Sequence, residues 1–379
     1  MKKSYIYILL IILLLITIPI FNNNDDKTFN IDGIRYSISV DGVSEDSFPE
    51  KGSYDVNVSC SNVVGTWNYN EWVVEIPNIG EDVFCDISFI SKSTVYLNNH
   101  IKNTLTGTTQ GNGQVVNENG YRYEGKNPNN YIKFNDELWR IIGVFDEDSH
   151  GQTGEYLTKI IRDESIGGLV WYKNDTNNWA NSSLKSLLNG AYYNAEDGTD
   201  SGYCYGYSTS VTKTCDYRVG GIQEEYRSMI KNVTWYLGGY SSNSVTTDNM
   251  YTYERSTSDT YYYTDNRNNK TVTGNIGLMY VSDYGYSVLS SSCARTTTLN
   301  SYGSSSCAGN SWLYGNGYEW TIGHYSSSWT SVFAVYYTGH VSTNGASRGY
   351  ATRPVLYLDS SVYIINGTGS KSDPYVIGM

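Results

Sequence analysis

The sequence predicts an α+β protein in which short antiparallel strands outnumber helices. Three observations indicate this fold class: short runs of alternating apolar and polar residues recur, only two segments have helical periodicity, and long polar loops separate them. The strict alternation of strands and helices that a doubly wound parallel sheet needs is missing. With 379 residues, the chain also exceeds one core of ordinary size, so we expect more than one folded unit.

The composition argues against two classes of protein. Only 17% of the residues are charged and 39% are hydrophobic, so the chain is not a highly charged disordered one. The net charge of −12 would repel a phosphate backbone, and no basic patch stands out, so we expect no nucleic-acid partner. With 38 tyrosines and nine tryptophans, the folded chain must bury many aromatic rings and provide hydrogen-bond partners for many hydroxyl and indole N–H groups.

Residues 1–27 predict export. Lysines precede an uncharged apolar run from Tyr5 to Phe21 and acidic residues follow it, which places the amino end of the run in the cytoplasm. At about 1.5 Å per residue the run reaches roughly 26 Å, the short end of the range for a spanning helix. We expect an uncleaved signal anchor in the cell membrane with the folded part outside. The alternative is a cleaved signal peptide and a secreted protein.

Residues 28–98 predict a small β-sandwich. Alternating runs lie between turn residues at 36–40, 53–59, 71–76 and 83–89. Cys60 and Cys85 flank Trp67 and Trp72, a pattern that resembles the immunoglobulin-like arrangement of a ring packed near an inter-sheet disulfide. We therefore expect an Ig-like sandwich here, followed by a linker rich in Asn, Gly and Thr at 99–129.

Residues 130–379 predict one larger α+β unit. An antiparallel meander is expected at 131–134, 138–145 and 156–161, and later strands at 276–280, 331–336 and 354–358. A short helix starts from Asn181 or Ser182 and stops at Gly190. A second helix, from Ile222 to Leu237, has one apolar face and two acids in its first turn. The polar stretches 240–270 and 287–311 predict long loops.

The six cysteines all lie in the part expected outside the cell. An even count there favours disulfides, although sequence alone does not select among the possible pairings. We expect sequence neighbours to pair: Cys60 with Cys85, Cys204 with Cys215, and Cys293 with Cys307. None of them forms a CxxC or a Cys/His ligand set, so we expect no metal and no cofactor.

A succession of short motifs spans 130–377: Asn130-Tyr-Ile-Lys-Phe134, Trp139-Arg-Ile-Ile-Gly143, Ile161-Arg-Asp163, Leu187-Leu-Asn189, Trp235-Tyr-Leu-Gly-Gly239, Met279-Tyr-Val-Ser-Asp-Tyr-Gly-Tyr286, Trp312-Leu, Arg353-Pro-Val-Leu-Tyr-Leu358 and Gly367-Thr-Gly-Ser with Asp373-Pro-Tyr375. This succession resembles an uncharacterised family of exported bacterial domains. That family in turn resembles the C-type-lectin-like fold, in the branch shared with formylglycine-generating enzymes and the variable proteins of diversity-generating retroelements. The resemblance implies a C-type-lectin-like domain with two helices and antiparallel sheets.

Two activities known in that branch have weak support in the residues. Calcium-dependent lectins use Glu-Pro-Asn and Trp-Asn-Asp, whereas this chain has only Asn127-Pro-Asn129, ahead of the domain's first strand. Formylglycine generation needs a reactive cysteine pair that holds copper, for which Cys293 and Cys307 are the candidates. Their Ser-rich surroundings predict a disulfide instead, and no other catalytic motif is found, so we expect no enzyme. An oxidase that uses these two cysteines is the alternative.

The stretch from Trp312 to Tyr350 interleaves aromatic rings with Ser, Thr, Asn and Gly, the composition of a recognition surface. The resemblance implies ligand-binding residues in this late segment. Alternation along strands would bury about half of its rings. We expect a noncatalytic cell-surface binding or adhesion protein for a protein or glycan ligand, with a structural envelope protein as the alternative. The expected ligand-binding residues, led by the two in the Ser-rich loop, are Tyr325, Trp329, Trp320, His324, Tyr337 and His340.

Overall fold

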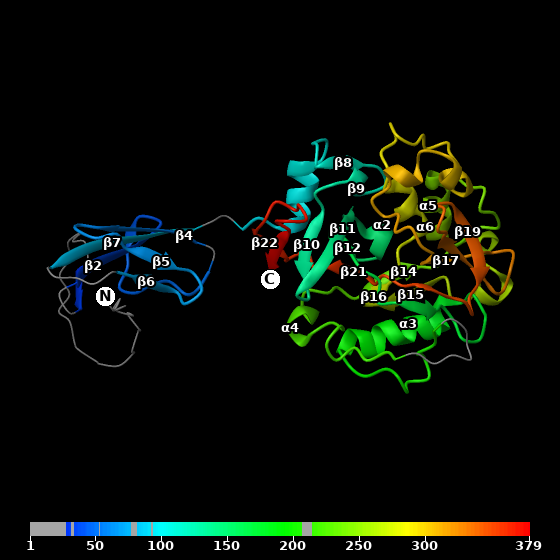
Figure 1. The fold of residues 1–379 in the computed structure, drawn as a ribbon, viewed down its shortest axis with the longest axis horizontal. Helices are drawn as coiled ribbons and strands as arrows, with labels where there is room; N and C mark the ends of the chain where they lie inside the picture. Colours follow the sequence, from blue (N-terminus) through cyan, green and yellow to red (C-terminus); the bar gives the residue numbers. More distant parts are fainter. Residues whose placement is uncertain (1–27, 32–33, 53, 77–81, 92–93, 207–213) are drawn as a thin grey trace. The chain divides into compact units, whose positions relative to one another are not determined.

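The computed structural model describes residues 28–379 except 32–33, 53, 77–81, 92–93 and 207–213. The predicted anchor at 1–27 therefore lies outside the described residues. No helix in the described part of the chain combines the length and the apolar character needed to cross a bilayer. The chain divides into two compact units between Thr94 and Val95 (Figure 1).

In the described residues of the first unit, the regular secondary structure is all β-strand. Its main sheet has the order β1-β2-β7-β4, with β3 on β2, and contains β1 (Thr28–Ile31), β2 (Ile34–Val40), β3 (Val43–Ser44), β4 (Tyr54–Cys60) and β7 (Val83–Ser91). A second ladder pairs β5 (Thr66–Asn68) with β6 (Val73–Glu75). Because β2 and β7 run parallel, the main sheet is mixed. Inward residues at alternate positions, such as Ile87 and Phe89, pack with Val74 of β6 in one core.

The first disulfide corrects the predicted inter-sheet bridge. Cys60 and Cys85 are register partners on the adjacent strands β4 and β7, with their Cα atoms 4.0 Å apart. The bond therefore lies within one sheet, because the two cysteines sit on neighbouring strands rather than on facing sheets. Trp67 packs edge-on against Phe89 of β7, with ring centroids 5.0 Å apart. The predicted tryptophan therefore packs in the core, but no disulfide between sheets lies beside it.

The second unit begins before the predicted linker ends. Residues 99–129 are not a linker: they contribute to α1 (Leu97–Asn99), the π-helix η1 (His100–Leu105), β8 (Asn112–Asn117) and β9 (Tyr121–Asn127). Ile101, Val115 and Tyr123 of this segment are buried in the core of the unit. Asn119 and Gly120, both at positive φ, lie in the turn between β8 and β9. The polar composition of this segment concealed a hairpin whose second strand has four consecutive buried residues, 122–125.

The largest sheet of this unit confirms the predicted meander. Its order is β16-β21-β12-β11-β10-β23-β22, with β9 on β11 and β8 on β9. β10 is antiparallel to β11, and β11 to β12. The strands not yet located are β10 (Tyr131–Phe134), β11 (Glu137–Phe145), β12 (Leu157–Arg162), β16 (Ile276–Gly277), β21 (Val355–Leu358), β22 (Tyr363–Asn366) and β23 (Tyr375–Gly378).

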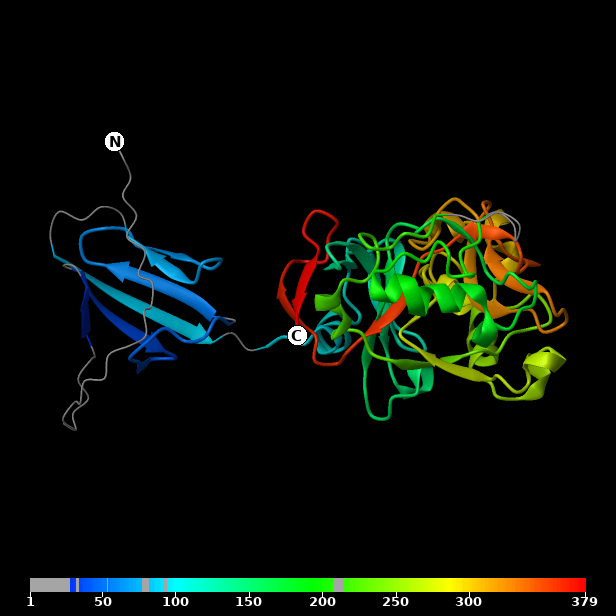
Figure 2. The ribbon, with the colours of Figure 1, turned by 90° about the horizontal axis from the view of Figure 1, so that it is seen from below.

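A second, five-stranded sheet of this unit has the order β13-β20-β17-β18-β19. Its strands are β13 (Gly168–Val170), β17 (Glu319–His324), β18 (Ser331–Val335), β19 (Val341–Gly345) and β20 (Gly349–Ala351). Within the unit, β17 and β19 lie on the side opposite β22 and the carboxyl terminus (Figures 1 and 2). The strands β17, β18, β19 and β20 and the segments that connect them span most of the aromatic stretch singled out in the sequence.

The helices are short. They are α2 (Glu147–His150), α3 (Ser183–Leu187), α4 (Glu224–Arg227), α5 (Thr247–Arg255) and α6 (Val281–Tyr286), with a π-helix η3 (Leu188–Tyr192) after α3 and 3-10 turns η2 (Trp179–Asn181), η4 (Asp259–Tyr261), η5 (Thr264–Asn266), η6 (Leu299–Ser304) and η7 (Ala308–Asn310). The Ser182 hydroxyl accepts the Lys185 N–H at 3.0 Å, so the predicted start of the first helix and its cap are confirmed. The predicted stop at Gly190 is wrong, because Gly190 lies inside η3, which continues the helical segment to Tyr192. Few helices among many strands confirm the mixed α+β class.

The second predicted helix is wrong over most of its length. Only α4 within 222–237 is helical, and Val233–Tyr236 instead forms β14, paired with β15 (Thr271–Gly274). β-Branched and aromatic residues in β14 suit a strand, and pairing with a segment nearly forty residues later outweighs the local helical pattern. Two further segments also differ from expectation, because the 240–270 loop contains α5 and the strand expected at 276–280 ends at Gly277.

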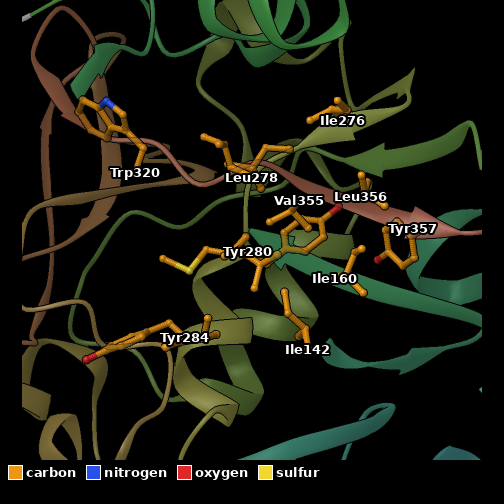
Figure 3. Packing of buried hydrophobic residues seen from close by; sticks show 14 of the residues in the cluster. Ile142, Ile160, Ile276, Leu278, Tyr280, Tyr284, Trp320, Val355, Leu356 and Tyr357 are labelled. Carbon is orange, nitrogen blue, oxygen red and sulfur yellow. The ribbon is translucent and has the colours of Figure 1, made fainter. Parts of the chain in front are cut away.

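The core of the second unit joins the large sheet to α6. Tyr280 lies beside Val355 and Ile160, and Tyr357 lies nearby on the same sheet (Figure 3). All six cysteines of the chain are paired as expected, with Cys204–Cys215 and Cys293–Cys307 in this unit. Three disulfides indicate folding in an oxidising compartment, as for secreted or extracellular proteins.

Candidate functional site

The second sheet carries a series of contacting aromatic rings, here called the aromatic ladder: Trp320, Tyr350, Tyr318, Tyr336 and Tyr337. Trp320 stacks on Tyr350 with centroids 4.4 Å apart, and Tyr350 stacks on Tyr318 at 4.8 Å. Tyr318 then contacts Tyr336 at 4.9 Å and Tyr337 at 5.3 Å. Exposure rises outward, from 1% at Trp320 to 37% at Tyr318 and 56% at Tyr337. The inner rings therefore support the outer ones, which solvent reaches.

Hydrogen bonds fix the inner part of the ladder. The indole N–H of Trp320 donates to the Leu169 carbonyl oxygen at 2.9 Å. The Asn344 amide donates to the hydroxyls of both Tyr350 and Tyr336, and the Tyr336 hydroxyl donates to the Thr343 carbonyl oxygen at 2.8 Å. Burial raises the pKa of Tyr350 to about 12, so this phenol is neutral near pH 7. These bonds hold the rings in fixed orientations.

An open hollow of about 420 Å³ borders the ladder and is lined by Tyr318, Asn344, Arg348, Gly349, Tyr350 and Ala351. Arg348 is exposed, and its guanidinium makes no hydrogen bond or ion pair with the described residues. The hydroxyls of Tyr318 and Tyr337 also have no partner in the described part of the chain. The hollow therefore combines rigid rings with polar groups that are free to bind another molecule.

The structure divides the six predicted ligand-binding residues among three environments. Trp320 and His324 are buried in β17, with 1% and 3% exposure, so neither side chain is placed to touch an external ligand. Tyr337 and the half-buried His340 lie at the outer end of the ladder, where the His340 ring is 4.9 Å from Tyr336. The half-buried Tyr325 and the exposed Trp329, at 52%, follow the opposite end of β17, on the order of 20 Å along the strand.

Sequence reasoning missed Tyr318, Tyr350, Asn344 and Arg348. Tyr318 and Tyr350 belong to the aromatic stretch, but their separation along the chain gave no sign that they stack. Arg348 was a single cation in a Ser/Gly-rich turn. The composition located the segment, whereas the pairing of β20 with β17 decides which of its aromatic rings come into contact.

His324 belongs to the core instead of the hollow. It lines a small cavity of about 10 Å³ with Asn178 and Trp179, and the side-chain atoms Nε2, Oδ1 and Nε1 of these three residues have no partner in the described structure. That space fits one ordered water molecule, which such polar atoms would hold. Burial lowers the pKa of His324 to about 4, so its imidazole is neutral at physiological pH.

A buried charge cluster of Asp283, Lys159 and Arg122 lies apart from the ladder. Asp283 of α6 is paired with Lys159 of β12 at 2.5 Å and with Arg122 of β9 at 3.0 Å. Its side chain is fully buried and also accepts the Tyr280 N–H at 2.9 Å. Burial alone would raise the pKa of Asp283, but the charges of Lys159 and Arg122 lower it to about 2. A closed cluster without solvent access ties three elements together and offers no surface to a substrate.

The predicted oxidase alternative loses its thiols in this structure, because Cys293 and Cys307 form a disulfide. Within the described residues, no group of three or more His, Cys, Asp or Glu side chains is arranged to hold a metal ion. The expectations of no enzyme, no metal and no cofactor remain predictions. The chain matches no protein-family model, no curated protein and no solved structure.

Proposed function

We propose that this chain is a noncatalytic extracellular binding protein whose second unit recognises its ligand, a glycan or a protein, through the outer end of the aromatic ladder. The observation that carries the proposal is the hollow itself, where Tyr318 and Tyr350 lie beside Arg348, whose guanidinium no described residue pairs. Rigid rings with few rotatable bonds lose little entropy on binding, and free hydroxyls and a cation supply direction.

The remaining expectations complete the proposal. Residues 1–27 are proposed as a signal anchor that attaches the protein to the membrane, and the first unit as an Ig-like spacer. The second unit is proposed as a C-type-lectin-like domain, related to the retroelement variable proteins through its late segment. The disulfides support a location outside the cytoplasm.

The proposal is tested with arrays of glycans and of surface proteins. The full chain, purified with its disulfides intact, is applied beside the variants Tyr337→Ala and Trp329→Ala. Tyr203→Ala is the matched control, because Tyr203 is an exposed tyrosine outside the ladder. We expect hits that Tyr337→Ala weakens at least tenfold and that Tyr203→Ala leaves unchanged. Hits lost only in Trp329→Ala would move the site to the opposite end of β17. Silence on both arrays would favour the structural envelope protein.

A further inference from the structure

We propose that the hollow beside Tyr318 and Tyr350 binds a sugar ring that bears a carboxylate, with Arg348 as the partner of that carboxylate. This inference rests on the proposed function and narrows its ligand to an acidic glycan, such as one with a terminal uronic or sialic acid. Three features of the hollow support it. Arg348 has no ion-pair partner among the described residues, hydrogen bonds fix the backbone turn that carries Arg348, and the strand and volume of the hollow suit a sugar.

Arg348 is the one charged side chain among the residues that line the hollow. Two acids of neighbouring segments, Glu319 of β17 and Asp175, form no ion pair with it. Glu319 is buried and paired with Arg353 at 2.6 and 2.8 Å, and the Asp175 carboxylate accepts the Ser347 N–H at 3.0 Å without forming an ion pair with Arg348. A guanidinium left free beside aromatic walls is suited to bidentate binding of a carboxylate.

The turn that carries Arg348 is ordered by its backbone. The Ala346 N–H donates to the Thr330 carbonyl oxygen at 2.8 Å, and the Arg348 N–H donates to the Gly345 carbonyl oxygen at 3.0 Å. With the Asp175 bond to Ser347, these contacts fix the turn between β19 and β20. The guanidinium thus extends from a preorganised base, which reduces the entropy that ligand binding must overcome.

The lining of the hollow favours a sugar over a peptide. Gly349, Tyr350 and Ala351 belong to β20, an inner strand that pairs with β13 and, through Ala351, with β17, so β20 is not an edge strand to which a peptide backbone could add. Asn344 belongs to the edge strand β19, but its amide already donates to the hydroxyls of Tyr350 and Tyr336. The volume of about 420 Å³ lies in the lower part of the range for small-ligand sites and suits a terminal sugar. The Tyr318 hydroxyl, which has no partner within the described part of the chain, is available to the hydroxyl groups of such a ring.

The test compares two probes by calorimetry with the full chain: a disaccharide ending in glucuronic acid, and the same disaccharide with its carboxylate reduced to the alcohol. Sialyllactose and lactose form a second matched pair that distinguishes the two acid sources. We expect one acidic sugar to bind at least tenfold more tightly than its neutral parent, and Arg348→Gln to remove about tenfold of that affinity, since a hydrogen bond to a charged group supplies such a factor. Arg267→Gln, at an exposed arginine outside the hollow, is the control and should change nothing.

Three outcomes would overturn the inference. Equal binding of acidic and neutral sugars, unaffected by Arg348→Gln but lost in Tyr318→Ala, would refute the carboxylate contact and leave the proposed function standing. Binding of a peptide carboxylate in an Arg348-dependent manner, without sugar binding, would refute the sugar and keep the cation site. No binding of any sugar probe, together with silence on the arrays, would refute both the inference and the proposed function.

Discussion

The hollow and the buried charge cluster both place an arginine among aromatic rings, yet they use it in opposite ways. Arg122 is buried over the rings of Phe145 and Tyr286 and forms an ion pair with Asp283. Arg348 is exposed and unpaired by the described residues. A buried charge without a partner lowers the stability of the fold, because it has lost its hydration. An exposed charge keeps its hydration and remains available to a ligand. Access and pairing, more than residue type, therefore separate a structural cluster from a candidate site.

The largest expected effect is on the buried side of this comparison. Asp283→Ala leaves Lys159 and Arg122 buried without their counter-charge, so we expect unfolding free energy to fall by about 3–5 kcal/mol. Denaturant unfolding of the purified chain measures it. The control is Asp200→Ala, at an exposed aspartate, which should change stability by less than about 0.5 kcal/mol. Equal losses in the two variants would mean that the cluster does not stabilise the core.

The second effect is the acid sensitivity of the His324 cavity. The folded pKa of about 4 lies below the ordinary value of 6.5, so the unfolded chain binds the proton first as pH falls. This contribution to stability is present above pH 6.5 and is lost progressively down to about pH 4, by about 3 kcal/mol in total. Unfolding measured across that window should show a shallower pH slope in His324→Gln than in the wild-type chain. His340→Gln is the control, and an unchanged slope in His324→Gln would contradict the prediction.

A smaller effect is expected where the ladder is held in place. Asn344→Ala removes the amide that donates to the hydroxyls of Tyr350 and Tyr336. We expect a loss of about 1 kcal/mol in unfolding free energy, because a typical hydrogen bond contributes about that much. Asn194→Ala, at an exposed asparagine, is the comparison variant. If both variants unfold at the same denaturant concentration as the wild-type chain, Asn344 does not order the ladder.

The smallest effect on stability belongs to the outer end of the ladder. Tyr337→Ala removes an exposed ring, so stability should stay within about 0.5 kcal/mol of the wild-type value. Thermal and denaturant unfolding would be compared with those of Tyr203→Ala. A loss above 2 kcal/mol would show that Tyr337 is a structural residue, and any loss of ligand binding in that variant would then say nothing about contact.

Local patterns predicted several parts of this molecule well. Alternation and turn residues located the β10–β12 meander, and Ser182 marked the start of α3. The expectation that cysteines near one another along the chain would pair is confirmed for Cys204 with Cys215 and for Cys293 with Cys307, and short loops close at little entropic cost. The same local reasoning failed for 222–237, where the partner of β14 lies far along the chain.

The candidate site shows the same division. Composition located the aromatic stretch. It did not show that Trp320 and His324 are buried, because β17 is a central strand buried on both faces and therefore has no alternation of buried and exposed residues. The outer rings were only partly predicted, with Tyr337 included and Tyr318 missed. Arg348 gave no signal at all, since a lone arginine in a turn is common on protein surfaces.

By itself, the sequence determined the strand-rich α+β class, the local meander and the first helix cap, because each depends on residues close together along the chain. Tertiary structure alone decided that 99–129 joins the second core, that Cys60 and Cys85 bridge one sheet, and that Tyr350 of β20 stacks between Trp320 and Tyr318. These outcomes depend on which distant strands pair and which faces they bury, and local periodicity does not contain that information.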